Sequence, residues 1–247
     1  MGSLDQVAPA FLRLAAHPLR WRLLGELARS DLRVRELATL TGEQQNLVSY
    51  HLRLLRAGGL LTATRSTFDG RDSYYHLDLD RCGELLAGVG AALHPELGRH
   101  APSPRRAPRV GVLFVCTGNS ARSPVAEALL RQRAGAHVTA VSAGTRPKPS
   151  LHPNAVRVLR DEYDIDLSVQ SPRHLDTVAG RRFDYVISLC DKAREACPDF
   201  PERPRRMHWS MPDPATDRAG YPAFQRSAAD IDIRIRHLLP VLADSGV

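Results

Sequence analysis

The feature that most constrains the fold is the stretch VLFVCTGNSARSPVAEALLR, which runs from Val112 to Arg131. An apolar run ends in Cys116, five small or polar residues lead to an arginine and a serine, and a helical pattern follows. Short apolar runs are typical of buried strands, and a proline in the first turn is typical of a helix start. The stretch therefore predicts a strand, a tight loop and a helix, with the cysteine at the carboxyl end of the strand.

The segment after position 109 continues this alternation. Strands are predicted over 109–115, 138–144 and 183–190, and helices over 124–135, 151–163 and 223–243. Such alternation indicates an α/β domain with a parallel sheet. Ligands of parallel sheets bind beyond the carboxyl ends of the strands, which is where Cys116 is expected.

The segment before position 95 has a different order, in which helices precede a hairpin. Helical spacing is found over 4–16, 18–29, 34–42 and 43–59. Two alternating segments around Asp69-Gly70 follow over 60–79, which is a strong hairpin signal. A short helix, a turn, a longer helix and a hairpin predict a winged helix-turn-helix, mainly α-helical with a β-hairpin wing.

The stretch PELGRHAPSPRRAPR, from 95 to 109, has no apolar period and is rich in proline and arginine, which predicts a linker. We therefore expect a DNA-binding domain over 1–94, a linker over 95–109 and an α/β domain over 110–247.

Composition excludes some classes of protein. No apolar run approaches the roughly 20 residues that span a membrane, and the first residues do not resemble a signal peptide, so a cytoplasmic location is expected. The net charge is +7 and almost entirely due to arginine, which favours oxyanions. In a cytoplasmic chain, cysteines are more often reactive or metal-binding than paired in structural disulfides. The four cysteines are Cys82, Cys116, Cys190 and Cys197.

The longer helix of the winged motif is expected in the major groove of DNA, with the wing along the backbone. Glutamine and asparagine can read adenine edges, and arginine reads guanine or holds phosphate. The candidate DNA contacts on the helix are Gln44, Gln45, Asn46, Ser49, Tyr50 and Arg53, and those on the wing are Arg65 and Arg71. The expected core positions of the helix are Leu47, Val48, Leu52, Leu54 and Leu55.

The segments AAHPLRWRLLGELA, VRELATLTG, NLVSYHLRLLRAGGLL and SYYHLDL resemble the ArsR/SmtB repressors. The resemblance implies a homodimer, formed through this domain, that releases operator DNA when an inducer binds. In DLRVREL, Arg33 and Arg35 stand where the arsenic-sensing branch has cysteines. Arginine supplies no thiolate to a soft metal, so the inducer is not identified. Cys82, just past the wing, is expected on a dimerisation helix as a packed small residue.

The cysteine loop suits the binding of a tetrahedral oxyanion. Its backbone N–H groups can wrap the anion, and the positive amino end of the next helix points to the same place. Both effects stabilise a thiolate. The loop consists of Cys116, Thr117, Gly118, Asn119, Ser120, Ala121 and Arg122.

Individual residues of the loop suggest individual roles. Arg122 can hold two oxygens of the anion, and the Ser123 hydroxyl can donate to the thiolate. Gly118 is expected to adopt a backbone conformation forbidden to most residues. Asp213, in an Asp-Pro pair, is a candidate general acid.

Residues 110–242 resemble the low-molecular-weight tyrosine phosphatase fold, with its C-x5-R-S motif after an apolar strand and its distant Asp-Pro. The resemblance allows two reactions. A phosphatase needs only the nucleophile, loop, arginine and acid, whereas an arsenate reductase also needs further thiols.

Cys190 and Cys197, in SLCDKAREACPDFP, are similar in spacing to the cysteines of thioredoxin-coupled arsenate reductases. The resemblance implies that Cys116 is the nucleophile, Cys190 the first relay thiol and Cys197 the terminal thiol. It also implies thioredoxin as reductant and no bound cofactor. A zinc site usually shows closer cysteine pairs, so no metal site is predicted.

Two departures from that family matter. Ala121 stands where the reductases often carry another cysteine. Some members bind potassium, and Asn119, Glu127 and Ser142 match its ligands, but Arg173 stands where an aspartate is expected. This arginine argues against potassium.

The sequence therefore predicts a bifunctional arsenic-resistance protein that reduces arsenate and binds operator DNA. Three alternatives stay open. They are a protein-tyrosine phosphatase, a regulator that senses an oxyanion or redox state without turnover, and a reductase coupled to mycothiol or glutaredoxin. Cys190 and Cys197 argue against the phosphatase, and the intact set of Cys116, Arg122 and Asp213 argues against a regulator without turnover. The complete three-cysteine relay makes mycothiol or glutaredoxin unnecessary.

Overall fold

The computed structural model describes residues 8–94, 97, 110–198, 200 and 203–244. The chain divides into two units, Met1–Ser103 and Pro104–Val247, and each is described by itself. The division falls inside the predicted linker. Apart from position 97, that linker lies outside the described residues, and its boundaries stay a prediction.

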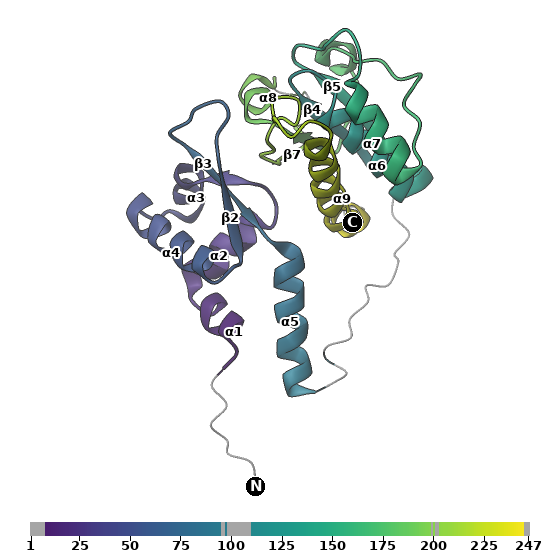
Figure 1. Ribbon diagram of the computed structural model, residues 1–247. Coiled ribbons are helices and arrows are strands. Elements are labelled where there is room, and N and C mark those ends of the chain that lie inside the picture. The colour runs from purple at the N-terminus through teal and green to yellow at the C-terminus, as the bar shows by residue number, and fades with distance from the viewer. Residues whose placement is uncertain (1–7, 95–96, 98–109, 199, 201–202, 245–247) are drawn as a thin grey trace. The chain divides into compact units, whose positions relative to one another are not determined.

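The N-terminal unit is a winged helix-turn-helix, as predicted (Figure 1). Its helices are α1 (Ala10–Ala15), α2 (Pro18–Leu27), α3 (Val34–Thr41), α4 (Gln45–Ala57) and α5 (Leu79–Leu93). The break between α1 and α2 is fixed locally, because the His17 ring accepts a hydrogen bond from the Leu19 N–H at 3.2 Å and Pro18 opens the helix. Gly42 ends α3 in the left-handed conformation, with φ of 68°.

Three short strands complete this unit. They are β1 (Leu32–Arg33), β2 (Leu61–Arg65) and β3 (Ser73–Leu77), in the antiparallel order β1-β3-β2. The hairpin β2–β3 is the predicted wing. The core beneath it is apolar and fully buried at Leu23, Leu37, Leu52, Leu55 and Leu60.

Helix α4 corrects the predicted core positions of the longer helix of the winged motif. Val48, Leu52 and Leu55 are buried, but Leu47 is 40% exposed and Leu54 is only half-buried. The buried residues are spaced by four and three, which defines the core stripe of the helix. Leu47 lies one residue off that stripe and therefore faces outward.

The C-terminal unit contains the predicted parallel sheet. Its strands are β4 (Val110–Cys116), β5 (Val138–Gly144), β6 (Tyr185–Ser188) and β7 (Arg205–His208), in the order β5-β4-β6-β7 and all parallel. Strand β7 was not predicted, because this edge strand begins with two exposed arginines and its residues RRMH carry no apolar pattern. The central strand β4 is buried along most of its length, which positions its last residue rigidly.

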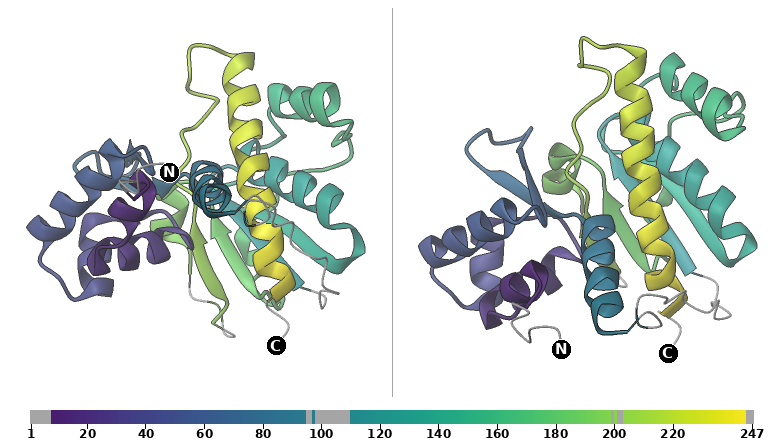
Figure 2. Two further views of the ribbon diagram at one scale, coloured as in Figure 1. Left: turned by 90° about the horizontal axis from the view of Figure 1, so that it is seen from below. Right: turned by 60° about the horizontal axis from the view of Figure 1, so that its bottom comes forward.

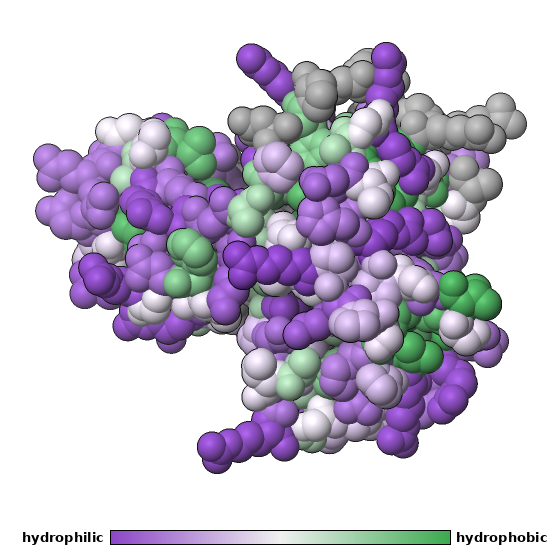
Figure 3. All heavy atoms as spheres, turned by 90° about the horizontal axis from the view of Figure 1, so that it is seen from above, coloured by the Kyte–Doolittle hydropathy of each residue, from purple (hydrophilic) through white to green (hydrophobic). Residues whose placement is uncertain are grey.

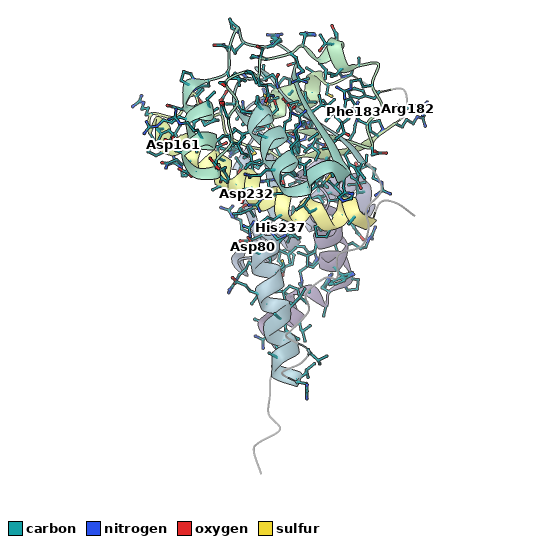
Figure 4. The ribbon with its side chains drawn as sticks, turned by 90° about the vertical axis from the view of Figure 1, so that its right-hand side faces the viewer. Asp80, Asp161, Arg182, Phe183, Asp232 and His237 are labelled. Atoms are coloured by element: carbon teal, nitrogen blue, oxygen red, sulfur yellow. The ribbon has the colours of Figure 1, made fainter. Side chains whose placement is uncertain are left out.

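The helices of this unit are α6 (Arg122–Ala134), α7 (Pro153–Tyr163), α8 (Asp191–Ala196) and α9 (Tyr221–Asp244). Helix α9, in yellow in Figure 2, packs beside α6, and α6 packs on β4 and β5. An ion pair joins the two helices, because Arg133 Nη2 donates to Asp232 Oδ2 at 2.6 Å (Asp232 is labelled in Figure 4).

Hydrophilic side chains dominate the face seen in Figure 3. Among the described residues, no helix combines the length and apolar character needed to cross a membrane.

Candidate functional site

The cysteine loop lies at the carboxyl edge of the sheet. Cys116 is the last residue of β4, which lies between β5 and β6, so three strand ends meet beside it. The loop over 117–121 leads directly into α6, which begins at Arg122. The amino end of a helix and the ends of parallel strands therefore face one place, as the sequence predicts.

The carbonyl groups of the loop are turned outward and held. They accept hydrogen bonds from the segment after β5: Thr145 N to Cys116 O at 3.2 Å, Arg146 N to Thr117 O at 2.8 Å, Lys148 N to Gly118 O at 2.9 Å and His152 N to Ser120 O at 2.8 Å. Within the described residues, the N–H groups of Gly118, Ser120 and Ala121 donate to no protein acceptor. A row of such amides makes an anion-binding concavity.

The Cys116 thiol is buried and has two polar neighbours. Its Sγ lies 3.0 Å from Ser123 Oγ, as predicted for a serine that contacts the sulfur. The Asn119 N–H donates to the same sulfur at 3.2 Å. Hydrogen bonds that donate to a thiolate stabilise the charged form, which is the reactive form of cysteine.

The strained residue of the loop is Asn119 and not Gly118. Asn119 has φ of 45°, whereas Gly118 is not in the left-handed region. The prediction for Gly118 was wrong. A Cβ at Gly118 would lie 3.2 Å from Lys148 Cγ and 3.3 Å from Ser120 Oγ, so these two side chains would have to shift slightly to admit it.

Hydrogen bonds hold Asn119 in its conformation. Its Nδ2 donates to Ser123 Oγ and Ser142 Oγ, each at 2.9 Å, and its Oδ1 accepts from the Arg173 N–H at 2.8 Å. Gly144 provides the space next to it, because a Cβ there would lie 2.8 Å from Thr117 O and 2.9 Å from Asn119 Cβ. Gly144 was not among the predicted site residues. A glycine at the end of a strand can indicate that another backbone segment approaches closely, so its position was a usable signal.

Glu127 does not fit the potassium site that the resemblance implies. This fully buried carboxylate accepts from Ser142 Oγ at 2.5 Å. Its other oxygen lies 2.7 Å from Arg131 Nη2 and 3.8 Å from Arg173 Nη2. Two guanidinium groups already face the carboxylate, so a further cation would be repelled.

Arg122 and Asp213 come together, as their predicted roles require. Arg122 is buried and donates through Nη1 to Met211 O at 2.9 Å. Its Nη2 lies 3.0 Å from Asp213 Oδ2, and the Asp213 side chain is 42% exposed. The guanidinium and the candidate acid are therefore in direct contact, and solvent can reach the Asp213 carboxyl group.

Cys190 and Cys197 lie at the two ends of α8. Cys190 is the residue before the helix, is buried, and places its Sγ 3.3 Å from Thr117 Oγ1 in the loop. Cys197 directly follows the helix and is half-buried. All four cysteines lie in the described part of the chain, and none forms a disulfide there.

The sequence analysis missed a buried polar cluster behind Cys190. It consists of Ser188, Asp191, His208 and Ser210. Two of these residues belong to β6 and β7, which meet only in the folded sheet. Nothing in a single sequence shows that the carboxylate after Cys190 is buried against this histidine.

In the N-terminal unit, the predicted DNA contacts lie mostly on the surface. Ser49 is half-buried and the others are exposed: Gln44, Gln45, Asn46, Tyr50, Arg53, Arg65 and Arg71. Gln44 precedes α4 as its cap residue. Arg65 Nη1 donates to the carbonyls of Gly70 and Arg71, each at 3.1 Å, so this side chain also braces the wing.

Arg33 and Arg35 form an ionic clamp on the wing. Arg33 Nη1 lies 3.5 Å and Arg35 Nη2 lies 3.0 Å from Asp72 Oδ2, and Arg33 Nη2 also pairs with Glu36 at 3.1 Å. Arg33 and Arg35, which stand where the ArsR/SmtB resemblance expects metal-binding cysteines, therefore connect the wing to the start of α3. Cys82 is buried in the core of this unit, and burial, with Asp78 adding, raises the pKa of its thiol.

Comparison with known sequences agrees with this geometry. The profile of the low molecular weight phosphotyrosine protein phosphatases matches residues 111–246. The chain belongs to this family. The profile of the MarR family matches residues 17–72, so the resemblance to ArsR/SmtB stays an interpretation.

Curated relatives of the phosphatase-family domain include arsenate reductases. One from Brevibacillus brevis is 37% identical over 125 residues, which cover 51% of this chain and 90% of that protein. One from Bacillus licheniformis is 37% identical over 129 residues, covering 51% and 91%. A solved arsenate reductase from Archaeoglobus fulgidus is 30% identical, covers 52% of this chain and 98% of that chain, and has a TM-score of 0.45.

The position of Gly144 yields a prediction about this family domain. Gly144→Ala pushes the backbone at Thr117 and Asn119, so we expect inorganic phosphate to bind about tenfold more weakly, a loss of roughly 1.4 kcal/mol. Titration calorimetry measures the affinity. Gly180→Ala is the matched control, because a Cβ there meets no atom within 4 Å. Equal phosphate affinity in Gly144→Ala and wild type would contradict the close approach.

Proposed function

We propose that the phosphatase-family domain reduces arsenate to arsenite through Cys116, Cys190 and Cys197, and that the N-terminal domain binds operator DNA. The proposal of a reductase rests on the position of Cys190, whose sulfur lies 3.3 Å from Thr117 Oγ1. Thr117 belongs to the cysteine loop over 116–122, which is called the oxyanion loop from here on. Hydrolysis of a phosphate ester has no use for a thiol at this place. The curated relatives named arsenate reductase support the same reading.

The first step takes place in the loop. Arsenate is a tetrahedral oxyanion, and the inward amides together with Arg122 suit it. The Cys116 thiolate attacks arsenic, an As–O bond breaks, and the departing oxygen takes a proton to leave as water. Asp213 is placed to give that proton, because its carboxyl group lies beside Arg122 at the mouth of the site.

The next steps move two electrons. The Cys190 thiolate attacks Cys116 Sγ, the S–As bond breaks, and its electron pair stays on arsenic, which leaves as arsenite. Two thiols become a disulfide while As(V) becomes As(III). Cys197 then attacks Cys190 and frees Cys116, and a dithiol of the thioredoxin type reduces the resulting Cys190–Cys197 disulfide.

The last exchange requires α8 to unwind. Cys197 is seven positions after Cys190, and a helical rise of 1.5 Å per residue places their Cα atoms about 10 Å apart. A disulfide needs Cα atoms within about 7 Å. The helix is only six residues long, so few backbone hydrogen bonds have to break for it to open.

A phosphatase is the second candidate. The family match and the set of Cys116, Arg122 and Asp213 favour it, because this set suffices for attack on a phosphate ester. It leaves Cys190 and Cys197 without a role in turnover.

The proposal for the N-terminal domain rests on α4 and on the match to the MarR family. Exposed amide and guanidinium groups lie along the helix and on the wing, which is the chemistry that reads bases and phosphates. Arg33 and Arg35 supply no thiolate, so the inducer is not a soft metal ion or arsenite bound at these two positions.

We propose that a second copy of this chain covers α5. Cys82 is the one buried residue of this 15-residue helix, while Leu86 and Leu93 are 51% and 77% exposed. Apolar side chains exposed along one helix favour association, and a twofold dimer matches the symmetry of an operator.

The relay predicts a specific cysteine phenotype. Wild type should oxidise NADPH in an arsenate-dependent way with thioredoxin and thioredoxin reductase, and Cys197→Ser should lower this rate at least about 100-fold. The variant should still release one arsenite per chain in a single turnover, because Cys116 and Cys190 remain. Cys82→Ser, in the other domain, is the control and should turn over normally. Hydrolysis of p-nitrophenyl phosphate by a wild type that does not turn over arsenate would identify a phosphatase.

DNA binding should depend on the N-terminal domain alone. A chain lacking residues 1–95 should lose binding to DNA from upstream of its own coding sequence and keep arsenate turnover. Electrophoretic mobility shifts at matched salt, with an unrelated fragment as control, measure this. Operator binding retained by the shortened chain would contradict the assignment.

The dimer should be sensitive to charge on α5. Leu86→Arg should shift the protein from dimer to monomer in sedimentation experiments, because a buried unpaired charge is costly. Val169→Arg is the control, since Val169 is 95% exposed in the other unit. A wild type that sediments as a monomer at all concentrations would refute the dimer.

A further inference from the structure

A buried carboxylate sits directly beside the first relay cysteine. Asp191 follows Cys190 and opens α8, and its side chain points into the protein. Its Oδ1 accepts a hydrogen bond from Ser210 Oγ at 2.8 Å and lies 3.0 Å from His208 Nε2. Asp191 and His208 are each only 2% exposed. The pair is therefore as buried as the hydrophobic core around it.

The histidine extends this contact to the sheet. His208 Nδ1 lies 2.8 Å from Ser188 Oγ and 3.1 Å from Ser188 O. Ser188 is the last residue of β6 and His208 the last of β7. The imidazole thus ties the ends of two strands to the first residue of α8.

The two ends of α8 are held very differently. Asp191 and Ala193 are buried, whereas Lys192, Glu195 and Ala196 are exposed. Cys197, which follows the helix, is half-buried. The amino end of α8 is anchored through buried polar and apolar contacts. Its carboxyl end is more exposed, although Cys197 packs against the core and the Pro198 carbonyl accepts a hydrogen bond from Arg206.

We propose that the Asp191–His208 pair is a latch that fixes Cys190 against the oxyanion loop while the carboxyl end of α8 brings Cys197 to it. Asp191 and His208 are then positioning residues for the two thiol exchanges and take no part in oxyanion binding. This inference rests on the proposed relay. It adds the two residues that hold Cys190 in place for both exchanges.

The oxyanion loop has its own supports, so the two functions can be separated. The loop is held by hydrogen bonds from the segment over 145–152 and from the Asn119 side chain, whose partners are Ser123, Ser142 and Arg173. Removing the Asp191 carboxylate leaves the His208 imidazole and the Ser210 hydroxyl without their shared acceptor. The start of α8 then shifts, and Cys190 shifts with it.

The test compares three quantities in Asp191→Ala, Asp191→Asn and wild type. The first is arsenite released in a single turnover without thioredoxin, measured after acid quench. The second is the affinity for inorganic phosphate by calorimetry, and the third is the alkylation rate of Cys190 by iodoacetamide, followed by peptide mass spectrometry. Phosphate affinity reports the loop, and alkylation reports the position of Cys190 whether or not arsenate is reduced.

We expect Asp191→Ala to slow arsenite release about tenfold to 100-fold, because a thiol displaced by about 1 Å attacks poorly. Its phosphate affinity should equal that of wild type, and its Cys190 should be alkylated faster. Asp191→Asn should recover most of the rate, because its amide oxygen still accepts from Ser210 and faces His208.

Other results overturn the latch. Unchanged alkylation of Cys190 in Asp191→Ala would do so, and so would a parallel loss of phosphate affinity, which indicates a general structural role. Ser210→Ala gives a second test should Asp191→Ala fail to fold, because it removes only one of the two hydrogen-bond partners of Asp191. It should slow arsenite release and speed the alkylation of Cys190, each by less than Asp191→Ala does. A wild type that releases no arsenite refutes the relay, while the alkylation rates still decide whether Asp191 fixes Cys190.

Discussion

The phosphatase-family domain depends on one constraint, which is that the loop after Cys116 must present its N–H groups to one point. A backbone can do this only if its carbonyl groups find donors elsewhere. The segment after β5 supplies four such donors, and Gly144 lets it come close enough. The positive φ of Asn119 is the remaining cost of this conformation, and three side-chain hydrogen bonds offset it.

The proposed relay requires the same domain to combine a rigid site with a mobile one. The Cys116 thiol is buried where three strand ends meet the start of α6, whereas the carboxyl end of α8 is more exposed. These parts rely on different hydrogen bonds. A helix of six residues gains little stability from its own backbone, so tertiary contacts decide which of its ends stays in place.

Much of this arrangement could be predicted from the sequence because it is local. The apolar run, Cys116, Ser123 and the following helix are contiguous, and their contacts follow from strand–loop–helix geometry. The edge strand β7 and the Asp191–His208 pair were missed, because both depend on segments that meet only through the sheet. Gly118 and Leu47 were misjudged for a third reason, since a loop conformation and a helix phase are set by packing that composition does not encode.

The clamp of Arg33 and Arg35 on Asp72 has a consequence for how this domain responds to ionic strength. The Arg33 and Asp72 side chains are 10% and 25% exposed, and partly buried ion pairs are screened far less than exposed ones. DNA contacts made by exposed arginines such as Arg71 weaken steeply as counterions compete for phosphate. If the N-terminal domain binds an operator as proposed, salt concentrations that remove it from DNA leave the wing in its orientation, so that rebinding requires no refolding of the hairpin.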